Sequence, residues 1–214
     1  MQVEWASVME TQQERQANRT DREPKLQVSR LVLASGSPRR ADILQAAGFA
    51  FDPCAVAVDE TRRPGEDAVA YVERLAVAKA QAGAAIHPAR VVLGADTVVV
   101  IEDEILGKPR DEADARRMLS LLSGEWHQVL TGVALVRAET AGAKVAHELT
   151  KVKFAAMSAA EIEWYLTTGE AIDKAGAYAI QGRAARFIEG IEGDYLNVVG
   201  LPVRLLYQLL RDFG

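Results

Sequence analysis

A carboxylate inside an otherwise apolar segment is the feature that most limits how this chain can fold. Residues 91–101, VVLGADTVVVI, are apolar apart from Gly94 and the pair Asp96-Thr97, and such a run predicts a buried strand. Because an unpaired buried carboxylate is costly, Asp96 requires a partner, a metal ion or a position at a strand edge. Gly94 interrupts the strand, as happens where a ligand or another backbone comes close. The segment indicates either an Asp that binds a divalent cation or accepts a proton from water, or an Asp hydrogen-bonded at a β-bulge.

A strand, a tight turn and a helix are predicted where the organised sequence begins. Residues 31–34, LVLA, suit a buried strand, and the SGSPRR segment at 35–40 suits the start of a helix that ends at Gly48. Small residues and a helix N-terminus favour an anion, and Arg39 and Arg40 add guanidinium groups that suit phosphate oxygens. The alternative is a serine that only caps the helix and two arginines that face water.

The remaining periodicities predict an α/β fold. Adjacent β-rich stretches at 126–136 and 144–154 favour antiparallel pairing, and residues 102–104 can turn the strand at 91–101 back as a hairpin. Together with the helical segments, this predicts a mixed sheet flanked by helices. The other predicted elements are a strand at 49–56, helices at 66–82, 111–122 and 201–213, a helix that Ser158 and Glu161 begin with a capping box, and a glycine-rich, mixed stretch at 175–193.

The chain is predicted to hold one domain at 29–214 behind a polar N-terminal extension. Residues 1–28 are rich in charged and amide side chains, which predicts a flexible or loosely helical segment. The extension does not have the pattern of a secretory signal, and the apolar runs are far shorter than the ~20 residues of a membrane span. Because Cys54 is the only cysteine, no intrachain disulfide can form. A cytoplasmic protein without a membrane partner is therefore expected.

Charge and composition restrict the partners of the chain. A net charge of −5 and an aromatic content of 6% argue against nucleic-acid binding. The positive partners of an anionic substrate would have to gather locally, and Lys79 and Lys108 could join the two arginines. Glu60, in a polar loop, could give a metal a second carboxylate, and Gln181 could hydrogen-bond a base. The alternative for each charged residue is a solvated side chain, and for Gln181 a hydrogen bond to backbone.

Other catalytic signatures do not occur in the sequence. There is no G-x-x-x-x-G-K-[ST] phosphate loop and no G-x-S-x-G nucleophile segment. The three histidines, His87, His127 and His147, have no metal-ligand spacing, and we expect them to be structural or solvated.

Seven segments, in this order, resemble the Maf family, the septum-formation-inhibitor proteins regarded as nucleoside triphosphate pyrophosphatases. The resemblance covers nearly everything after the polar extension. The segments are LASGSPRR (33–40), RLAVAKA (74–80), LGADTVV (93–99), GKPRD (107–111), LSGEWHQVLTGVAL (122–135), DKAGAYAIQG (173–182) and NVVGLP (197–202).

The resemblance implies a fold similar to the inosine triphosphate pyrophosphatases, with an elongated mixed β-sheet flanked by helices and two lobes around a cleft. It also implies hydrolysis of a nucleoside triphosphate substrate to the monophosphate and pyrophosphate, with a divalent metal cation, Mg²⁺ or Mn²⁺. Asp96 would activate the water and, with Glu60, assist the metal. The substrate-binding residues that it implies are Ser35, Arg39, Arg40, Lys79, Thr97, Lys108 and Gln181. Of these, Arg39, Thr97 and Gln181 match the positions that determine substrate specificity in the family.

The KAGAYAIQG segment at 174–182 resembles the branch of the family that hydrolyses dTTP and UTP. The alternatives are the branch that acts on 7-methyl-GTP and a non-catalytic nucleotide-binding regulator of septation. A homodimer is an expectation from the resemblance alone.

Overall fold

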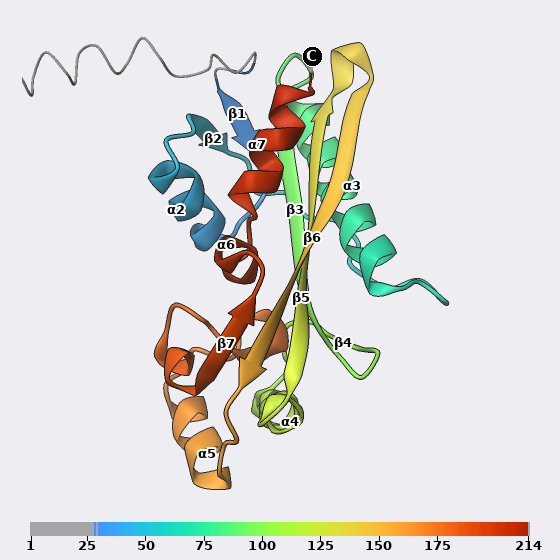
Figure 1. Ribbon diagram of the computed structural model, residues 1–214. Helices are drawn as coiled ribbons and strands as arrows, with labels where there is room; N and C mark the ends of the chain where they lie inside the picture. Colours follow the sequence, from blue (N-terminus) through green and yellow to red (C-terminus); the bar gives the residue numbers. More distant parts are fainter. Residues whose placement is uncertain (1–27, 29, 214) are drawn as a thin grey trace, which may run out of the picture.

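A long antiparallel hairpin forms the spine of the molecule. The computed structural model describes Val28 and residues 30–213, so the predicted extension lies outside the described residues except for Val28. Strand β5 (Trp126–Arg137) pairs along its whole length with β6 (Gly142–Phe154). The short helix η2 (Ala138–Thr140) and Ala141, whose φ is 50°, close the hairpin. Figure 1 shows both strands running from end to end of the molecule.

The other strands complete a mixed seven-stranded sheet in the order β2-β1-β3-β5-β6-β7, with β4 paired to β3. β1 is parallel to both β2 and β3, whereas β4, β5, β6 and β7 make antiparallel pairs. Glu102 and Asp103 turn β3 into β4 with φ values of 47° and 67°. The strands are β1 (Leu31–Leu33), β2 (Phe51–Pro53), β3 (Val92–Ile101), β4 (Glu104–Leu106) and β7 (Ile188–Glu192). This arrangement confirms the predicted α/β class and mixed sheet.

Helices cover both faces of the sheet (Figure 1). α3 lies along one face of β3 and β5, and α6 and α7 lie on the opposite face over β5 and β6. α4 and α5 pack against each other at the end where β5 begins and β6 finishes. The helices are α2 (Pro38–Ala46), α3 (Ala68–Ile86), α4 (Glu112–Leu122), α5 (Ala159–Thr167), η3 (Ala175–Ala177), η4 (Arg183–Phe187), α6 (Tyr195–Val199) and α7 (Val203–Arg211).

Two glycines let α3 approach the sheet closely enough for backbone to touch backbone. A Cβ atom at Gly94 would lie 2.2 Å from the carbonyl oxygen of Ala76, and one at Gly132 would lie 2.3 Å from that of Val72. The alternative that Gly94 marks the approach of another backbone is thereby confirmed. The close packing also fixes Lys79, on α3, relative to the residues of β3.

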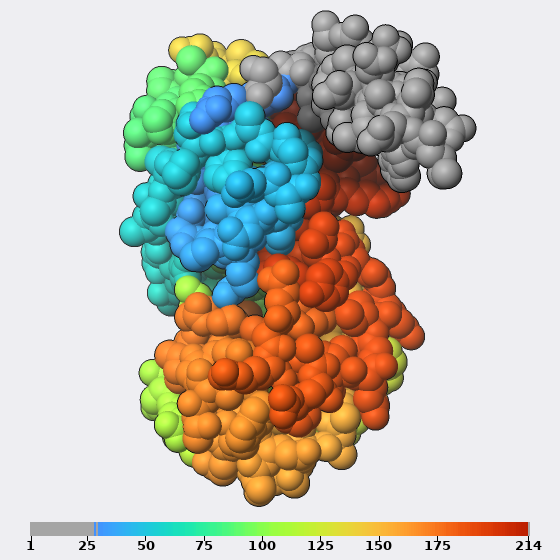
Figure 2. Space-filling view, turned by 90° about the vertical axis from the view of Figure 1, so that its left-hand side faces the viewer, coloured from blue at the N-terminus to red at the C-terminus, as the bar shows by residue number. Residues whose placement is uncertain are grey.

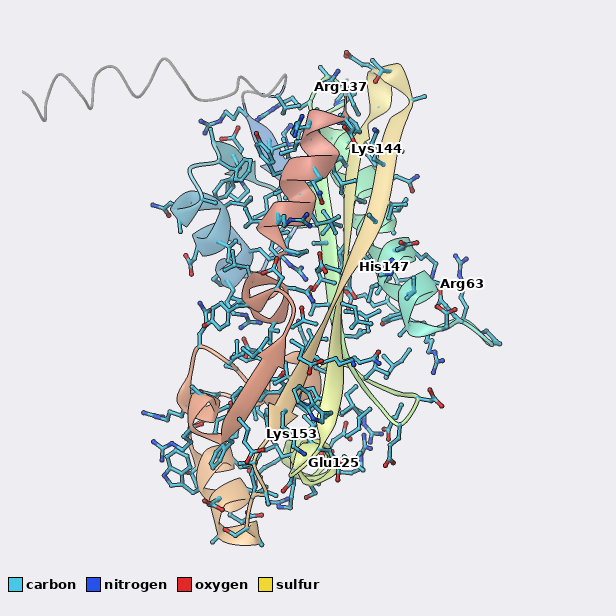
Figure 3. All side chains as sticks on the ribbon, viewed as in Figure 1. Arg63, Glu125, Arg137, Lys144, His147 and Lys153 are labelled. Atoms are coloured by element: carbon cyan, nitrogen blue, oxygen red, sulfur yellow. The ribbon has the colours of Figure 1, made fainter. Side chains whose placement is uncertain are left out.

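Polar side chains mark the ends of the hairpin. Figure 3 shows Arg137 and Lys144 near its closed end, and Glu125 and Lys153 at the opposite end. His147 lies between them and pairs with Glu73 of α3, with Nδ1 and Oε1 2.8 Å apart. The site described below lies between these two ends.

Several predicted boundaries needed correction. The strand predicted at 49–56 spans only Phe51–Pro53, and the helix predicted at 66–82 runs from Ala68 to Ile86. The stretch at 175–193 contains strand β7, which periodicity did not reveal because only five residues at a sheet edge belong to it. The capping box at Ser158 is confirmed, with both of its hydrogen bonds formed. No helix in the described part of the chain combines the length and apolarity needed to cross a membrane.

Candidate active site

A gap along one edge of β3 opens a cleft in the sheet. β1 pairs with β3 only as far as Leu93, and β4 pairs with it only from Val99 onwards. Between these points the described strands pair with β3 on the β5 side alone. The chain passes from the carboxyl end of β1 into α2, and β1 lies between β2 and β3 in the sheet. Open α/β sheets bind ligands at such positions, beyond the carboxyl ends of their strands. The cleft has a volume of about 650 Å³, and the space-filling view in Figure 2 shows the surface hollowed between upper and lower parts of the molecule.

All nine residues singled out in the sequence line this cleft, although they come from six separate segments. The fold therefore brings these distant segments together around one cleft. The nine are Ser35, Arg39, Arg40, Glu60, Lys79, Asp96, Thr97, Lys108 and Gln181.

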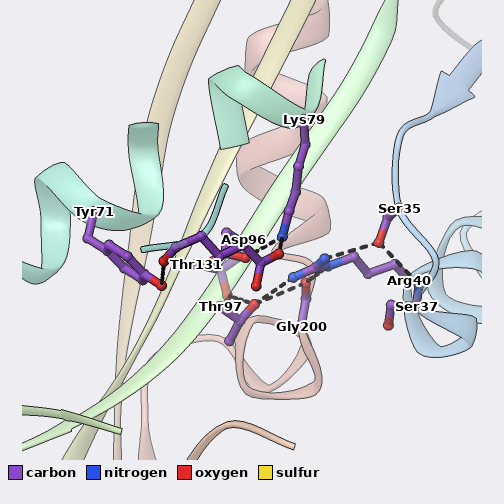
Figure 4. A network of polar contacts seen from close by, with 10 residues as sticks. Ser35, Ser37, Arg40, Tyr71, Lys79, Asp96, Thr97, Thr131 and Gly200 are labelled. Carbon is purple, nitrogen blue, oxygen red and sulfur yellow. Dashed lines mark hydrogen bonds and ion pairs between the residues drawn. The ribbon is translucent and has the colours of Figure 1, made fainter. Parts of the chain in front are cut away.

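Asp96 lines the cleft next to the ammonium group of Lys79 (Figure 4). Asp96 Oδ1 accepts a hydrogen bond from Lys79 Nζ at 2.7 Å, and Glu60 Oε1 lies 2.7 Å from the same nitrogen. Only 8% of Asp96 is exposed, and this burial raises the pKa of its carboxyl group while the charge of Lys79 opposes the rise. The second oxygen, Oδ2, accepts no hydrogen bond from the described residues. Asp96 is therefore a buried carboxylate in which Oδ1 is hydrogen-bonded to Lys79 and Oδ2 can accept a further hydrogen bond or a proton.

Arg40 joins three segments on the other side of β3 (Figure 4). Its guanidinium donates from Nε to the carbonyl of Gly200 (2.8 Å), from Nη1 to Ser35 Oγ (3.1 Å) and from Nη2 to Thr97 Oγ1 (3.0 Å). Arg40 is 8% exposed, and burial lowers the pKa of its guanidinium. Because most of its donors are used within the protein, Arg40 positions the turn and Thr97 in addition to adding charge to the cleft.

The start of α2 offers free polar groups to the cleft. Ser37 is the N-cap residue, but its side chain forms no capping hydrogen bond with the described residues, and Pro38 follows at the first helical position. Its hydroxyl and the unpaired N–H groups of the first turn therefore face a site that suits an anion. Arg39 lies beside them and pairs across the cleft with Asp173, with Nη1 and Oδ2 3.6 Å apart.

Sequence reasoning missed residues that contribute backbone atoms or whose spacing was not examined. Tyr71 lies two helical turns before Lys79 on the same face of α3, and its hydroxyl donates to the carbonyl of Glu60 at 2.8 Å. The separation of eight residues, close to two helical turns, was a usable signal. Gly200 acts through its carbonyl oxygen, so its side chain gave no chemical clue. His127, expected to be structural, is buried and hydrogen-bonds the hydroxyl of Tyr178 at 2.9 Å.

Comparison with known proteins identifies the family. The pattern of the family described as Maf-like protein matches residues 30–213. The chain belongs to this family. A dTTP/UTP pyrophosphatase of Symbiobacterium thermophilum is 52% identical over 187 residues, which cover 87% of this chain and 95% of that protein. One of Hahella chejuensis, with the same name, is 51% identical and covers 86% of this chain and 92% of its own length.

Among solved structures, the Staphylococcus aureus Ham1 protein shares the fold with a TM-score of 0.52. It is 14% identical in sequence, and the match covers 86% of this chain and all of that protein. The likeness therefore concerns the architecture of the Maf-like domain and supports the predicted fold class.

The cleft can be tested for its fit to a divalent metal ion. Asp96 and Glu60 converge on one cationic nitrogen, Lys79 Nζ, which shows that the two carboxylates can serve a single positive centre. Within the described residues, no group of three or more His, Cys, Asp or Glu side chains could hold a metal alone. Mg²⁺ commonly takes one or two protein carboxylates and completes its shell with substrate phosphate oxygens and water. The donor set therefore fits a metal that arrives with, or is completed by, a phosphate ligand.

Proposed function

We propose that this chain hydrolyses nucleoside triphosphates, dTTP and UTP foremost, to the monophosphate and pyrophosphate in the cleft around Asp96. The observation that carries the proposal is a buried carboxylate, one oxygen of which accepts no hydrogen bond from the described residues, in a cleft lined also by Arg39, Arg40, Lys79 and Lys108. The names and the near-complete coverage of the Maf-like relatives support the same reaction and the pyrimidine substrates.

The cations and the start of α2 would bind the triphosphate. Ser35, Ser37 and the first N–H groups of α2 offer donors to phosphate oxygens, and the helix dipole favours negative charge there. Lys108 lies in the turn before α4 and forms no ion pair with the described residues. Fixed donors, such as Arg40 and the N–H groups of α2, stabilise a phosphoryl transition state because they need no reorientation as charge develops.

Asp96 would act as the proton acceptor for the attacking water. Its Oδ2 accepts no hydrogen bond from the residues that the structure describes, and Lys79 fixes the orientation of the carboxylate through Oδ1. Without a bound cation, burial raises the pKa of the Asp96 carboxyl group, and a higher pKa strengthens a general base. Glu60 and Asp96 would hold a divalent cation such as Mg²⁺ or Mn²⁺. When bound, the metal would lower the pKa of water and offset phosphate charge.

Pyrophosphate release from a panel of triphosphates tests the proposal. The panel is dTTP, UTP, CTP, GTP and 7-methyl-GTP, with Mg²⁺ or Mn²⁺, and the variant Asp96→Asn. We expect release from dTTP and UTP that Asp96→Asn reduces by at least about a hundredfold, because the variant keeps the shape of the side chain but not the base. Asp103→Asn, at the exposed turn between β3 and β4, is the matched control and should retain activity.

The alternatives give different results in the same assay. Release confined to 7-methyl-GTP would keep the reaction and replace the substrate. Tight triphosphate binding without turnover under either metal would favour the regulator of septation. Undiminished activity in Asp96→Asn would refute the role given to that residue.

A further inference from the structure

In the turn that carries Gln181, the neighbouring Ile180 is buried in the core, whereas Gln181 itself is not. Gln181 is exposed in the cleft, and its amide makes no hydrogen bond to the described residues. The turn is closed by one hydrogen bond, from the N–H of Gly182 to the carbonyl of Ala179 at 3.0 Å. The exposed part of the turn, which presents Gln181, therefore depends on neighbouring side chains for its position.

Tyr165 of α5 holds the beginning of this turn. Its side chain is fully buried, and its hydroxyl accepts a hydrogen bond from the N–H of Ala179 at 3.1 Å. Burial raises the pKa of Tyr165 to about 12, so the hydroxyl keeps its proton at neutral pH. That proton points to Glu170 Oε2, at the longer distance of 3.5 Å.

Glu170 holds the end of the turn. Its Oε2 accepts the N–H of Arg183 at 2.8 Å, a hydrogen bond strengthened by the negative charge. The carboxylate lies directly against Gly182, where a Cβ atom would be 2.2 Å from Oε2. Gly182 has φ −103° and ψ −151°, values open to any residue. A side chain at position 182 would therefore displace the carboxylate of Glu170 from the turn.

We propose that Glu170 is a positioning residue for substrate choice, whose carboxylate holds the 179–183 turn so that the amide of Gln181 meets the base of the triphosphate. The inference rests on the proposed function, because it concerns the same reaction. Glu170 is not among the residues that line the cleft, so it acts only through the turn. A fixed amide can discriminate between bases because a mismatched base leaves polar groups unpaired.

The first test compares kcat and KM of Glu170→Ala for dTTP and GTP. We expect KM for dTTP to rise about tenfold with a smaller change in kcat, and the preference for dTTP over GTP to fall by about the same factor. Glu170→Gln keeps an oxygen acceptor and should retain most of the preference. Glu163→Ala removes an exposed carboxylate from α5, the helix that precedes Glu170, where it pairs with Arg116, and should leave both constants unchanged.

Two double variants separate positioning from a general structural effect. Gly182→Ala should displace the carboxylate and reproduce the loss seen in Glu170→Ala, and it should have no further effect in the Glu170→Ala background. In a Gln181→Ala background, Glu170→Ala should change kcat/KM by less than about twofold, because the two residues act through one contact.

Three results would overturn the inference. One is a Glu170→Ala variant that retains its preference for dTTP. Another is additivity with Gln181→Ala. The third is an equal fall of kcat for every triphosphate together with a lower melting temperature. Failure of the proposed function differs from all three, because the unaltered protein would then release no pyrophosphate and the basis of the inference would be removed as well.

Discussion

The substitution Gly94→Ala adds a single methyl group where β3 and α3 touch through their backbones. The new Cβ would lie 2.2 Å from the carbonyl oxygen of Ala76, 2.6 Å from the N–H nitrogen of Ala80 and 3.0 Å from the Cβ of Ala80. Normal C···O contacts are about 3.3–3.6 Å, so the helix and strand must separate by roughly 1 Å. Helix backbone cannot swing aside as the end of a flexible side chain can.

The cost follows from this displacement. Overpacking of a core costs typically about 1–3 kcal/mol, and a clash with two backbone atoms belongs at the upper end of that range. For a domain of this size, about 3 kcal/mol corresponds to a melting temperature lower by roughly 6–12 °C. The variant should still fold at 25 °C if the parent has ordinary stability.

The displacement also reaches the site. Lys79 lies between Ala76 and Ala80 on α3, and its Nζ is 2.7 Å from Asp96 Oδ1. A separation of about 1 Å would take this contact beyond hydrogen-bond length. Misplacement of a catalytic group by that amount can cost about a hundredfold in rate. We therefore expect kcat/KM to fall by about this factor at temperatures where the variant remains folded.

Thermal unfolding followed by circular dichroism, and pyrophosphate release from dTTP at 25 °C, measure the two effects. Gly190→Ala on β7 is the control, because a Cβ there has an ordinary contact of 3.7 Å with Trp126. A Gly94→Ala variant with the melting temperature and activity of the parent would refute the reasoning, since the helix would then be free to adjust without disturbing Asp96.

Two further predictions concern the dependence of stability on pH, in separate windows. Burial lowers the pKa of His127 to about 4, so only the unfolded chain takes up its proton near 6.5. Stability should therefore fall by about 2 kcal/mol between pH 7 and 5, and His127→Gln should remove that part in denaturant titrations. Hydrogen bonds from Arg110 and Arg117 lower the pKa of Asp114 to about 2, so its contribution is present above the unfolded value of ~3.9 and is lost as pH falls toward 2. Asp114→Asn should lose less stability than the parent between pH 5 and 2.5, and an unchanged acid profile in either variant would contradict the corresponding assignment.

The sequence was sufficient for the fold class because the main elements carry strong patterns. The apolar run at 91–101, the paired stretches of the β5–β6 hairpin and the Ser158 capping box each predicted their element locally. β7 could not be predicted in this way. Its five residues, IEGIE, include no buried one, and the strand exists because the end of β6 offers it an edge.

The candidate site was predictable in its residues but not in its internal contacts. The charged and hydroxyl side chains could be identified from their residue types, as Asp96 could from the apolar residues around it in sequence. Two findings required coordinates. Arg40 uses three of its N–H donors within the protein, and one of them bonds the carbonyl of Gly200, 160 residues away in sequence. The close approach of the Glu170 carboxylate to Gly182 likewise has no signature in the sequence.

The gap along β3 explains how neighbouring residues can serve one site from opposite faces of a sheet. Side chains alternate along a strand, and accordingly Asp96 meets Lys79 of α3 while Thr97 meets Arg40 on the face of α2 and α6. In a continuous sheet these groups would lie in separate layers. With β1 ending at Leu33 and β4 pairing only from Val99, both faces open into the same cleft. One strand thus presents Asp96 and Thr97 to the same cleft from its two faces, and a shift of α3 should disturb Asp96 before it disturbs Thr97.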